Sequence, residues 1–83
     1  MTAIKVYGAD WCQPTTLVRE YLDELGVDYD YIDIEADPEA AKWVREQNGG
    51  KEKKPTVDID GVVLSTPSRN ELDAALREAG VRV

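Results

Sequence analysis

The sequence predicts a single α/β domain in which a four-stranded mixed sheet is flanked by three helices, in the order β-α-β-α-β-β-α. Three observations predict this fold class. The chain has 83 residues, which suits one compact domain over residues 1–83. Short segments in which every second residue is apolar are separated by longer segments whose apolar residues recur at helical spacing. An Asp60-Gly61 pair, typical of a two-residue hairpin turn, separates the last two strand-like segments.

The first half of the chain predicts a strand, a helix and a second strand. Residues 3–7 alternate and are rich in strand-forming residues, which indicates the first strand. Residues 15–25 place apolar side chains along one helical face, and Gly26 suits the end of that helix. The apolar residues of this face are Leu17, Val18, Tyr21, Leu22 and Leu25. Residues 29–34 form the second predicted strand.

The second half predicts a helix, a hairpin and a last helix. Asp37-Pro38 indicates a helix start, because aspartate suits the N-cap and proline suits the first helical position. That helix runs to about Gln47. Residues 56–60 and 62–64 are the two predicted strands of the hairpin. Ser68-Arg69-Asn70-Glu71 is a capping box, which opens the last helix.

The predicted elements can be assembled in few ways. A strand–helix–strand connection is right-handed, so the first two predicted strands are parallel. The hairpin adds antiparallel strands, which makes the sheet mixed. We expect the three helices to cover both faces of the sheet.

The composition excludes several classes of function. The formal charge is −7 and the acidic residues are spread along the chain, so we expect no binding to nucleic acid or to an anionic membrane surface. No run of 18 apolar residues is present, which excludes a membrane-spanning helix. The segment from Met1 to Lys5 lacks the features of a signal peptide, so we expect a cytoplasmic protein.

The chain has no histidine and one cysteine, Cys12. Serine–histidine–aspartate and cysteine–histidine catalysis within the chain are therefore excluded. Ordinary zinc sites are excluded as well, so we predict no metal ligands. No internal disulfide can form, and a lone cysteine suits a reducing compartment. We also expect a monomer.

Cys12 lies between the first predicted strand and the first predicted helix, where open α/β sheets place their sites. A helix N-terminus favours a thiolate over a thiol. We expect the Thr15 hydroxyl to donate a hydrogen bond to the sulfur anion. The Asp10 carboxylate, about 8–10 Å away, opposes the thiolate by only about 0.4–1 kcal/mol. The alternative is that Cys12 is simply a small buried apolar residue.

The segment Asp10-Trp11-Cys12-Gln13-Pro14-Thr15 resembles the Trp-Cys-Gly-Pro-Cys site of thioredoxins, with threonine in place of the second cysteine. Tyr7 and Cys12 are placed as in glutaredoxins, whose bacterial members are also similar in length. Lys54-Pro55-Thr56-Val57 resembles the loop that holds the cis-proline of this family, and Leu64-Ser65-Thr66-Pro67-Ser68 stands where glutaredoxins begin their last helix. The resemblance implies a thioredoxin-like fold, a cis-Pro55 that exposes the backbone of Lys54 to a thiol substrate, and a thiol–disulfide oxidoreductase activity.

The sequence departs from the family pattern in three ways. Without a second cysteine, only a monothiol cycle is available, in which an external thiol resolves the mixed disulfide formed by Cys12. The motif also differs from the Cys-Gly-Phe-Ser motif of cluster-binding monothiol glutaredoxins. Ala9 stands where glutaredoxins often carry a basic residue for a glutathione carboxylate. Two alternatives stay open: a non-catalytic binding module with this fold, and a glutathione-dependent iron–sulfur cluster carrier.

The predicted site follows from the motif and the resemblance together. The candidate catalytic residues are Cys12 and Thr15. The candidate substrate-binding residues are Tyr7, Trp11, Gln13, Pro14, Lys54, Pro55, Thr66 and Ser68. A basic cluster of Lys51, Lys53 and Lys54 is a further candidate for the glutathione carboxylate. We expect protein thiols and mixed disulfides as partners, glutathione as a co-substrate and no tightly bound cofactor.

Overall fold

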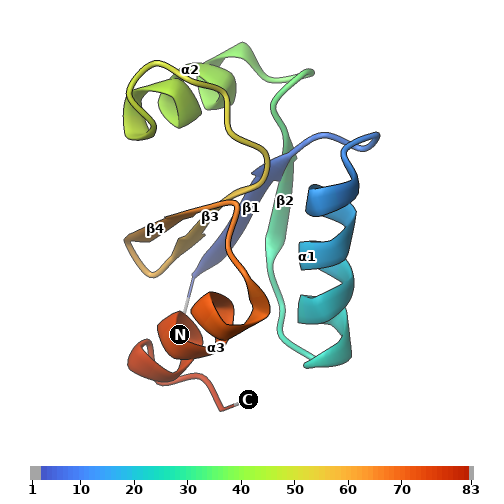
Figure 1. The fold of residues 1–83 in the computed structure, drawn as a ribbon, viewed down its shortest axis with the longest axis vertical. Coiled ribbons are helices and arrows are strands. Elements are labelled where there is room, and N and C mark those ends of the chain that lie inside the picture. Colours follow the sequence, from blue (N-terminus) through green and yellow to red (C-terminus); the bar gives the residue numbers. More distant parts are fainter. Residues whose placement is uncertain (1–2, 83) are drawn as a thin grey trace.

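The computed structural model describes residues 3–82, so the two ends of the predicted domain 1–83 lie outside the described residues. It contains four strands and three helices in the predicted order (Figure 1). Their bounds are β1 Ile4–Gly8, α1 Gln13–Glu24, β2 Asp30–Asp33, α2 Pro38–Gln47, β3 Thr56–Ile59, β4 Val62–Ser65 and α3 Arg69–Glu78. The predicted fold class is thereby confirmed.

The four strands form one mixed sheet in the order β2-β1-β3-β4. Strands β1 and β2 are parallel, with Val6 opposite Tyr31. Strand β3 runs antiparallel to β1 and brings Val57 opposite Val6, and β4 returns antiparallel to β3. The right-handed connection and the hairpin predicted these directions, and both are confirmed.

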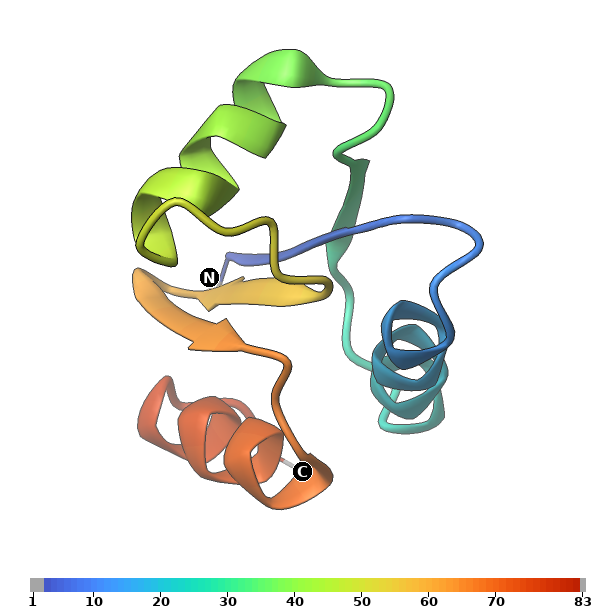
Figure 2. The ribbon, with the colours of Figure 1, turned by 45° about the horizontal axis from the view of Figure 1, so that its top comes forward.

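The helices cover both faces of the sheet. In Figure 2, α2 lies on one side of the sheet, and α1 and α3 lie on the other. The main core lies under α1 and α3, where Val6 and Val57 of the sheet meet Leu22 and Leu76 of the helices. A smaller core lies under α2 and contains Ile34, Ala41 and Val44.

The local signals that start and end the elements act as the sequence suggests. The Asp37 carboxylate accepts a hydrogen bond from the Ala40 N–H and caps α2. Ser68 and Glu71 form both hydrogen bonds of the predicted capping box at α3. Asp60 and Gly61 have φ values of 52° and 92°, as a type I′ hairpin turn requires.

All four strands and α1 differ from their predicted bounds by one or two residues. Helix α1 begins at Gln13, two residues before its predicted start at Thr15, because its first turn carries no apolar residue for the periodicity to detect. Strand β2 covers only Asp30–Asp33 of the predicted 29–34. Ile34 still donates its backbone N–H to the Gly8 carbonyl, so the chain leaves the sheet just after it pairs with the end of β1.

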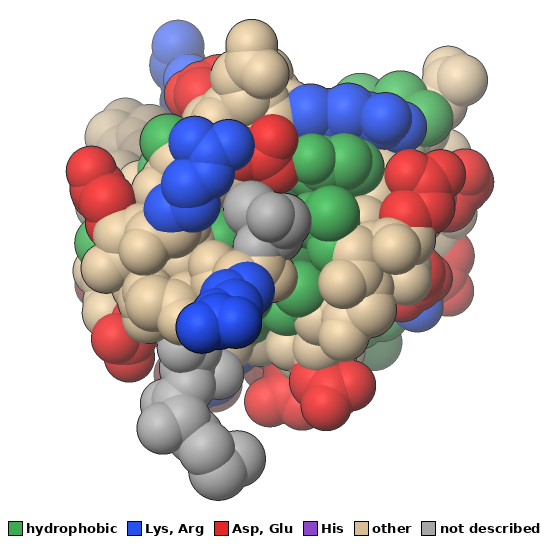
Figure 3. Space-filling view, turned by 90° about the horizontal axis from the view of Figure 1, so that it is seen from below, with side chains coloured by type: hydrophobic (Ala, Val, Ile, Leu, Met, Phe, Trp, Pro, Cys, Tyr) green, Lys and Arg blue, Asp and Glu red, His purple; other side chains and the backbone are tan. Residues whose placement is uncertain are grey.

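The surface agrees with the expected spread of acidic charge. On the face in Figure 3, most acidic side chains lie around the rim, and hydrophobic side chains form a band between charged ones. Within residues 3–82, no helix is long and apolar enough to cross a membrane.

Candidate active site around Cys12

Cys12 is the N-cap residue of α1, at the point where the chain passes from β1 into the helix. Its backbone is extended, its N–H bonds to the Ala9 carbonyl, and its carbonyl accepts the N–H of Thr16. No side chain caps this helix end and no acidic residue lies in its first turn. The positive end of α1 is therefore free to act on the sulfur of Cys12, which is 9% exposed.

The loop that carries Pro55 lies directly against Cys12. The Lys54–Pro55 peptide bond is cis, as the family resemblance implied. The Cys12 thiol donates a weak hydrogen bond to the Lys54 carbonyl, with 3.8 Å between sulfur and oxygen. On the far side of the loop, the Thr66 N–H donates to the Pro55 carbonyl at 2.8 Å. Residues 42 positions apart in the chain thus meet at the sulfur.

Thr15 differs from the sequence-based expectation. Its side chain is 1% exposed and its hydroxyl has no hydrogen-bond partner in this structure, so the predicted bond to the sulfur is not made here. The side chain packs against the Cα of Gly8, where an added Cβ would lie 2.5 Å from both Oγ1 and Cγ2 of Thr15. Position 15 therefore holds a buried hydroxyl with unused hydrogen-bonding capacity.

Trp11 presents an aromatic surface beside Cys12. Its side chain is 68% exposed, and its indole N–H donates to the Glu35 carboxylate at 2.7 Å. The Lys54 ammonium lies 5.3 Å from the centre of the Trp11 ring. This cation–π contact holds a positive charge on the open side of the site. Gln13, also predicted to contact substrate, is exposed next to Cys12.

Asp10 has partners that the sequence did not reveal. The Tyr31 hydroxyl donates to its carboxylate at 2.6 Å, and the Arg19 guanidinium lies 3.9 Å from the centre of the Tyr31 ring. Burial and the hydrogen bond to Asp10 raise the pKa of Tyr31 well above its usual value. Tyr31 therefore stays a donor at neutral pH and holds the Asp10 carboxylate at the β2 edge.

Tyr7 is not brought to Cys12, which corrects the expectation that it lines the substrate cleft. Its ring stacks on Trp43 of α2, with ring centres 4.6 Å apart, on the opposite face of the sheet from the main core. Burial and the nearby Asp58 and Asp37 carboxylates raise the pKa of Tyr7. The period of β1 explains the difference, since Tyr7 must face away from its neighbour Val6.

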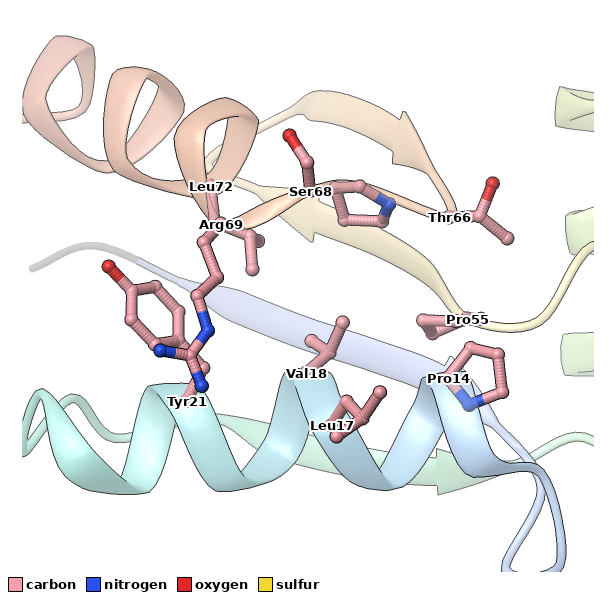
Figure 4. Close-up of a pocket in the computed structure, with 10 residues that line it drawn as sticks. Pro14, Leu17, Val18, Tyr21, Pro55, Thr66, Ser68, Arg69 and Leu72 are labelled. Carbon is pink, nitrogen blue, oxygen red and sulfur yellow. The ribbon is translucent and has the colours of Figure 1, made fainter.

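A groove of about 240 Å³ runs between α1 and α3, and Pro14 and Pro55 line its end next to Cys12. Four predicted substrate-binding residues line it: Pro14, Pro55, Thr66 and Ser68. Figure 4 shows Pro14, Pro55 and Thr66 at one end, and Arg69 and Tyr21 at the other. The Ser68 hydroxyl is already engaged in capping α3.

The sequence reasoning missed the far half of this groove. Leu17 and Tyr21 appeared only as part of the apolar stripe of α1, although Leu17 lies at the edge of that stripe and is 53% exposed. Arg69 appeared only as a position inside the capping box. No local pattern of the sequence marks these residues as one groove, because the groove depends on how α3 packs beside α1.

The lysine cluster is only partly gathered at the site. Lys54 reaches Trp11, whereas Lys51 and Lys53 are exposed in the preceding loop. An ion pair between Arg45 and Glu52, with 2.7 Å between the atoms, joins that loop to α2. Among residues 3–82, no group of three or more acidic or cysteine side chains is placed to hold a metal ion.

Known proteins resemble this chain over nearly its whole length. The glutaredoxin family model matches residues 4–64. Mycoredoxin 1 of Corynebacterium glutamicum is 35% identical over 77 residues, which is 92% of this chain and 95% of that protein. A crystal structure of a thioredoxin-like protein, 30% identical, superposes with a TM-score of 0.78 over 88% of this chain and 99% of that one. A wheat glutaredoxin, 24% identical, has the same fold with a TM-score of 0.73 over 95% of this chain and 83% of its own. The chain belongs to the glutaredoxin family and is a glutaredoxin-like redox protein.

Proposed function

We propose that this protein is a monothiol thiol–disulfide oxidoreductase that acts on mixed disulfides, above all glutathionylated ones. The observation that carries the proposal is the position of its one cysteine. Cys12 caps the N-terminus of α1 and faces the backbone of the cis-Pro55 loop at Lys54. In this arrangement the helix N-terminus stabilises the Cys12 thiolate, and the cis-Pro55 loop can hold the sulfur of a substrate beside it.

The proposed cycle has two exchange steps. The Cys12 thiolate attacks the glutathione sulfur of a protein–glutathione disulfide; a bond forms between these sulfurs, and the protein sulfur leaves with the electron pair and takes a proton from water. A second glutathione, as thiolate, then attacks the glutathione sulfur bound to Cys12. Glutathione disulfide forms and the Cys12 thiolate is released. Overall, the protein–glutathione disulfide and one glutathione give the protein thiol and glutathione disulfide, so no internal second cysteine is needed.

Three groups support the sulfur and its substrate in this proposal. The free N-terminus of α1 stabilises the anion. When the thiol loses its proton it can no longer donate to the Lys54 carbonyl, and the unpartnered Thr15 hydroxyl supplies a donor in its place. The backbone of Lys54, released from that contact, pairs with the substrate chain.

Lys54 is the candidate for the carboxylate of the small thiol. Ala9, at the position where the family often has a basic residue, is fully buried and lacks a charge. Lys54 instead reaches over Trp11 on the open side of Cys12, with Lys51 and Lys53 in the same loop. These lysines are the local positive charge in a chain of net charge −7, so they would attract an anionic thiol.

The test is reduction of a glutathionylated peptide, coupled to removal of the glutathione disulfide that forms. We expect turnover by the wild type, none by Cys12→Ser, and a KM for glutathione that rises several-fold in Lys54→Gln. Lys42→Gln on α2, with the same loss of charge, is the matched control. The assay is repeated with other low-molecular-weight thiols, since a relative is named a mycoredoxin. Equal rates for wild type and Cys12→Ser would refute the proposal.

A further inference from the structure

The groove between α1 and α3 continues from the redox centre but extends well past it. Pro14 and Pro55 line its near end, and both adjoin Cys12 through the helix start and the cis-proline loop. From Pro14 to Tyr21, helix α1 advances about 10 Å at about 1.5 Å per residue. In Figure 4, α1 lines one side of the groove along this length, and the other side passes from Pro55, Thr66 and Ser68 to Arg69 and Leu72 of α3.

The wall of the groove is apolar, and part of its apolar surface is exposed to solvent. Val18 and Leu72 are buried beneath it, whereas Leu17 is 53% exposed beside them. A side chain of this size loses about 1.5–3 kcal/mol of stabilisation when it stays in water. Leu17 therefore offers an apolar contact to whatever enters the groove.

The far end of the groove carries the Arg69 guanidinium, with the Glu24 and Asp73 carboxylates near it. The Arg69 guanidinium lies 4.6 Å from the centre of the Tyr21 ring, and its side chain is 65% exposed. Its ion-pair partner among the described residues, Glu24, is 4.0 Å away and equally exposed. The neighbouring Asp73 carboxylate instead accepts the Tyr21 hydroxyl at 2.5 Å, which fixes the ring under Arg69. Arg69 also stands at the first position of α3, whose N-terminus favours anions.

We propose that this groove binds an extended segment of a protein substrate next to its disulfide cysteine, with a large apolar side chain against Leu17 and a carboxylate at Arg69. The inference rests on the proposed redox function of Cys12. An extended chain advances about 3.3 Å per residue, so about three residues span the 10 Å of groove. The second residue from the cysteine is then the apolar one, and the third is the acidic one.

The test uses short capped peptides whose cysteine is disulfide-bonded to a coloured aryl thiol. The Cys12 thiolate attacks the peptide sulfur, a Cys12–peptide disulfide forms, and the aryl thiolate leaves with the electron pair. This single step needs no second thiol, so its rate reports recognition of the peptide alone. The peptides carry leucine or serine at the second position and glutamate or lysine at the third, in both chain directions from the cysteine.

We expect the wild type to react about threefold to tenfold faster with leucine than with serine at the second position. Glutamate is expected to be about twofold to fivefold faster than lysine at the third. Leu17→Ser reduces the first ratio towards one, whereas Val62→Ser on β4, a residue of similar exposure, leaves it as it is. Arg69→Glu reverses the second ratio, whereas Arg77→Glu, with the same charge change on the same helix, does not.

The outcomes separate the two proposals. Equal rates for all peptides with the wild type, or an equal loss of the leucine preference in Leu17→Ser and Val62→Ser, would overturn the groove assignment and leave the redox function standing. Release of no coloured thiolate from any peptide would overturn the redox function, and the groove assignment with it.

Discussion

Replacing Thr15 by valine separates what its hydroxyl does for the fold from what it does for the sulfur. The hydroxyl is buried at 1% exposure and has no hydrogen-bond partner. A buried hydroxyl without a partner costs about 1–3 kcal/mol, and valine has nearly the same shape without that cost. We therefore expect Thr15→Val to raise the free energy of unfolding of the thiol form by about 1 kcal/mol.

The same substitution is expected to make Cys12 less reactive. If the hydroxyl donates to the thiolate, its loss removes a hydrogen bond to a charged acceptor, which contributes about 1.5–3 kcal/mol. Its loss should therefore slow the alkylation of Cys12 at neutral pH by about tenfold or more, since 1.36 kcal/mol corresponds to a factor of ten. A gain in stability and a loss of thiolate are thus predicted together.

Two measurements check this prediction. Urea unfolding at acidic pH, which favours the protonated thiol, gives the stability, and iodoacetamide alkylation between pH 4 and pH 10 gives the reactivity. Thr56→Val is the contrasting variant, because the Thr56 hydroxyl is equally buried but bonds to Lys53 and Asn48, so its loss should destabilise the protein. An unchanged alkylation profile in Thr15→Val would refute the role at the sulfur. A loss of stability would show that the hydroxyl has a partner after all.

Three further predictions follow from the same region. Gly8→Ala places a Cβ 2.5 Å from Thr15 and should lower the free energy of unfolding by about 1–3 kcal/mol, and Thr15→Ala in the same chain should restore part of it, both measured in urea. Thr66 has a φ of 43°, which is strained for a β-branched residue. Thr66→Gly should therefore stabilise the protein by about 0.5–1 kcal/mol, once the entropy cost of glycine is subtracted. An unchanged urea midpoint would contradict this prediction. Burial and Asp10 raise the pKa of Tyr31 in the folded protein, so the stabilisation from Tyr31 is complete below pH 10 and is lost above it. The free energy of unfolding should therefore fall more steeply above pH 10 in the wild type than in Tyr31→Phe. Parallel pH profiles of the two proteins would argue against this role of Tyr31.

Much of the fold could be predicted because its signals are local. Asp60 and Gly61 adopt the positive φ values of the predicted hairpin turn, and Ser68 and Glu71 form the capping box that the sequence pattern predicts. Such signals depend on neighbours within four residues, so a single sequence contains them. The element order then leaves few topologies, because strand–helix–strand connections are right-handed.

The site was predictable only where one segment carries it. Cys12 could be placed at the N-terminus of α1 from the sequence around it, and Pro55 from the family resemblance. The groove depends on how far α3 lies from α1, which no local pattern contains. The error at Tyr7 was avoidable. Neighbouring residues of a strand face opposite sides of the sheet, so Tyr7 faces away from Val6 and lies on the side that α2 covers.

A single cysteine gives the surroundings of the sulfur a particular importance. A mixed disulfide on Cys12 has no neighbouring thiol to resolve it, so its lifetime depends on how a second thiol reaches a sulfur that is only 9% exposed. Two approaches differ in chemistry. The groove beyond Pro55 is apolar and ends at Arg69, whereas the side next to Trp11 carries the Lys54 ammonium. On our proposals, the groove holds the protein chain while the Lys54 side admits the small anionic thiol. The substrate protein and the second glutathione then approach Cys12 from different directions, so a protein segment that still lies in the groove does not block the thiol that resolves the Cys12–glutathione disulfide.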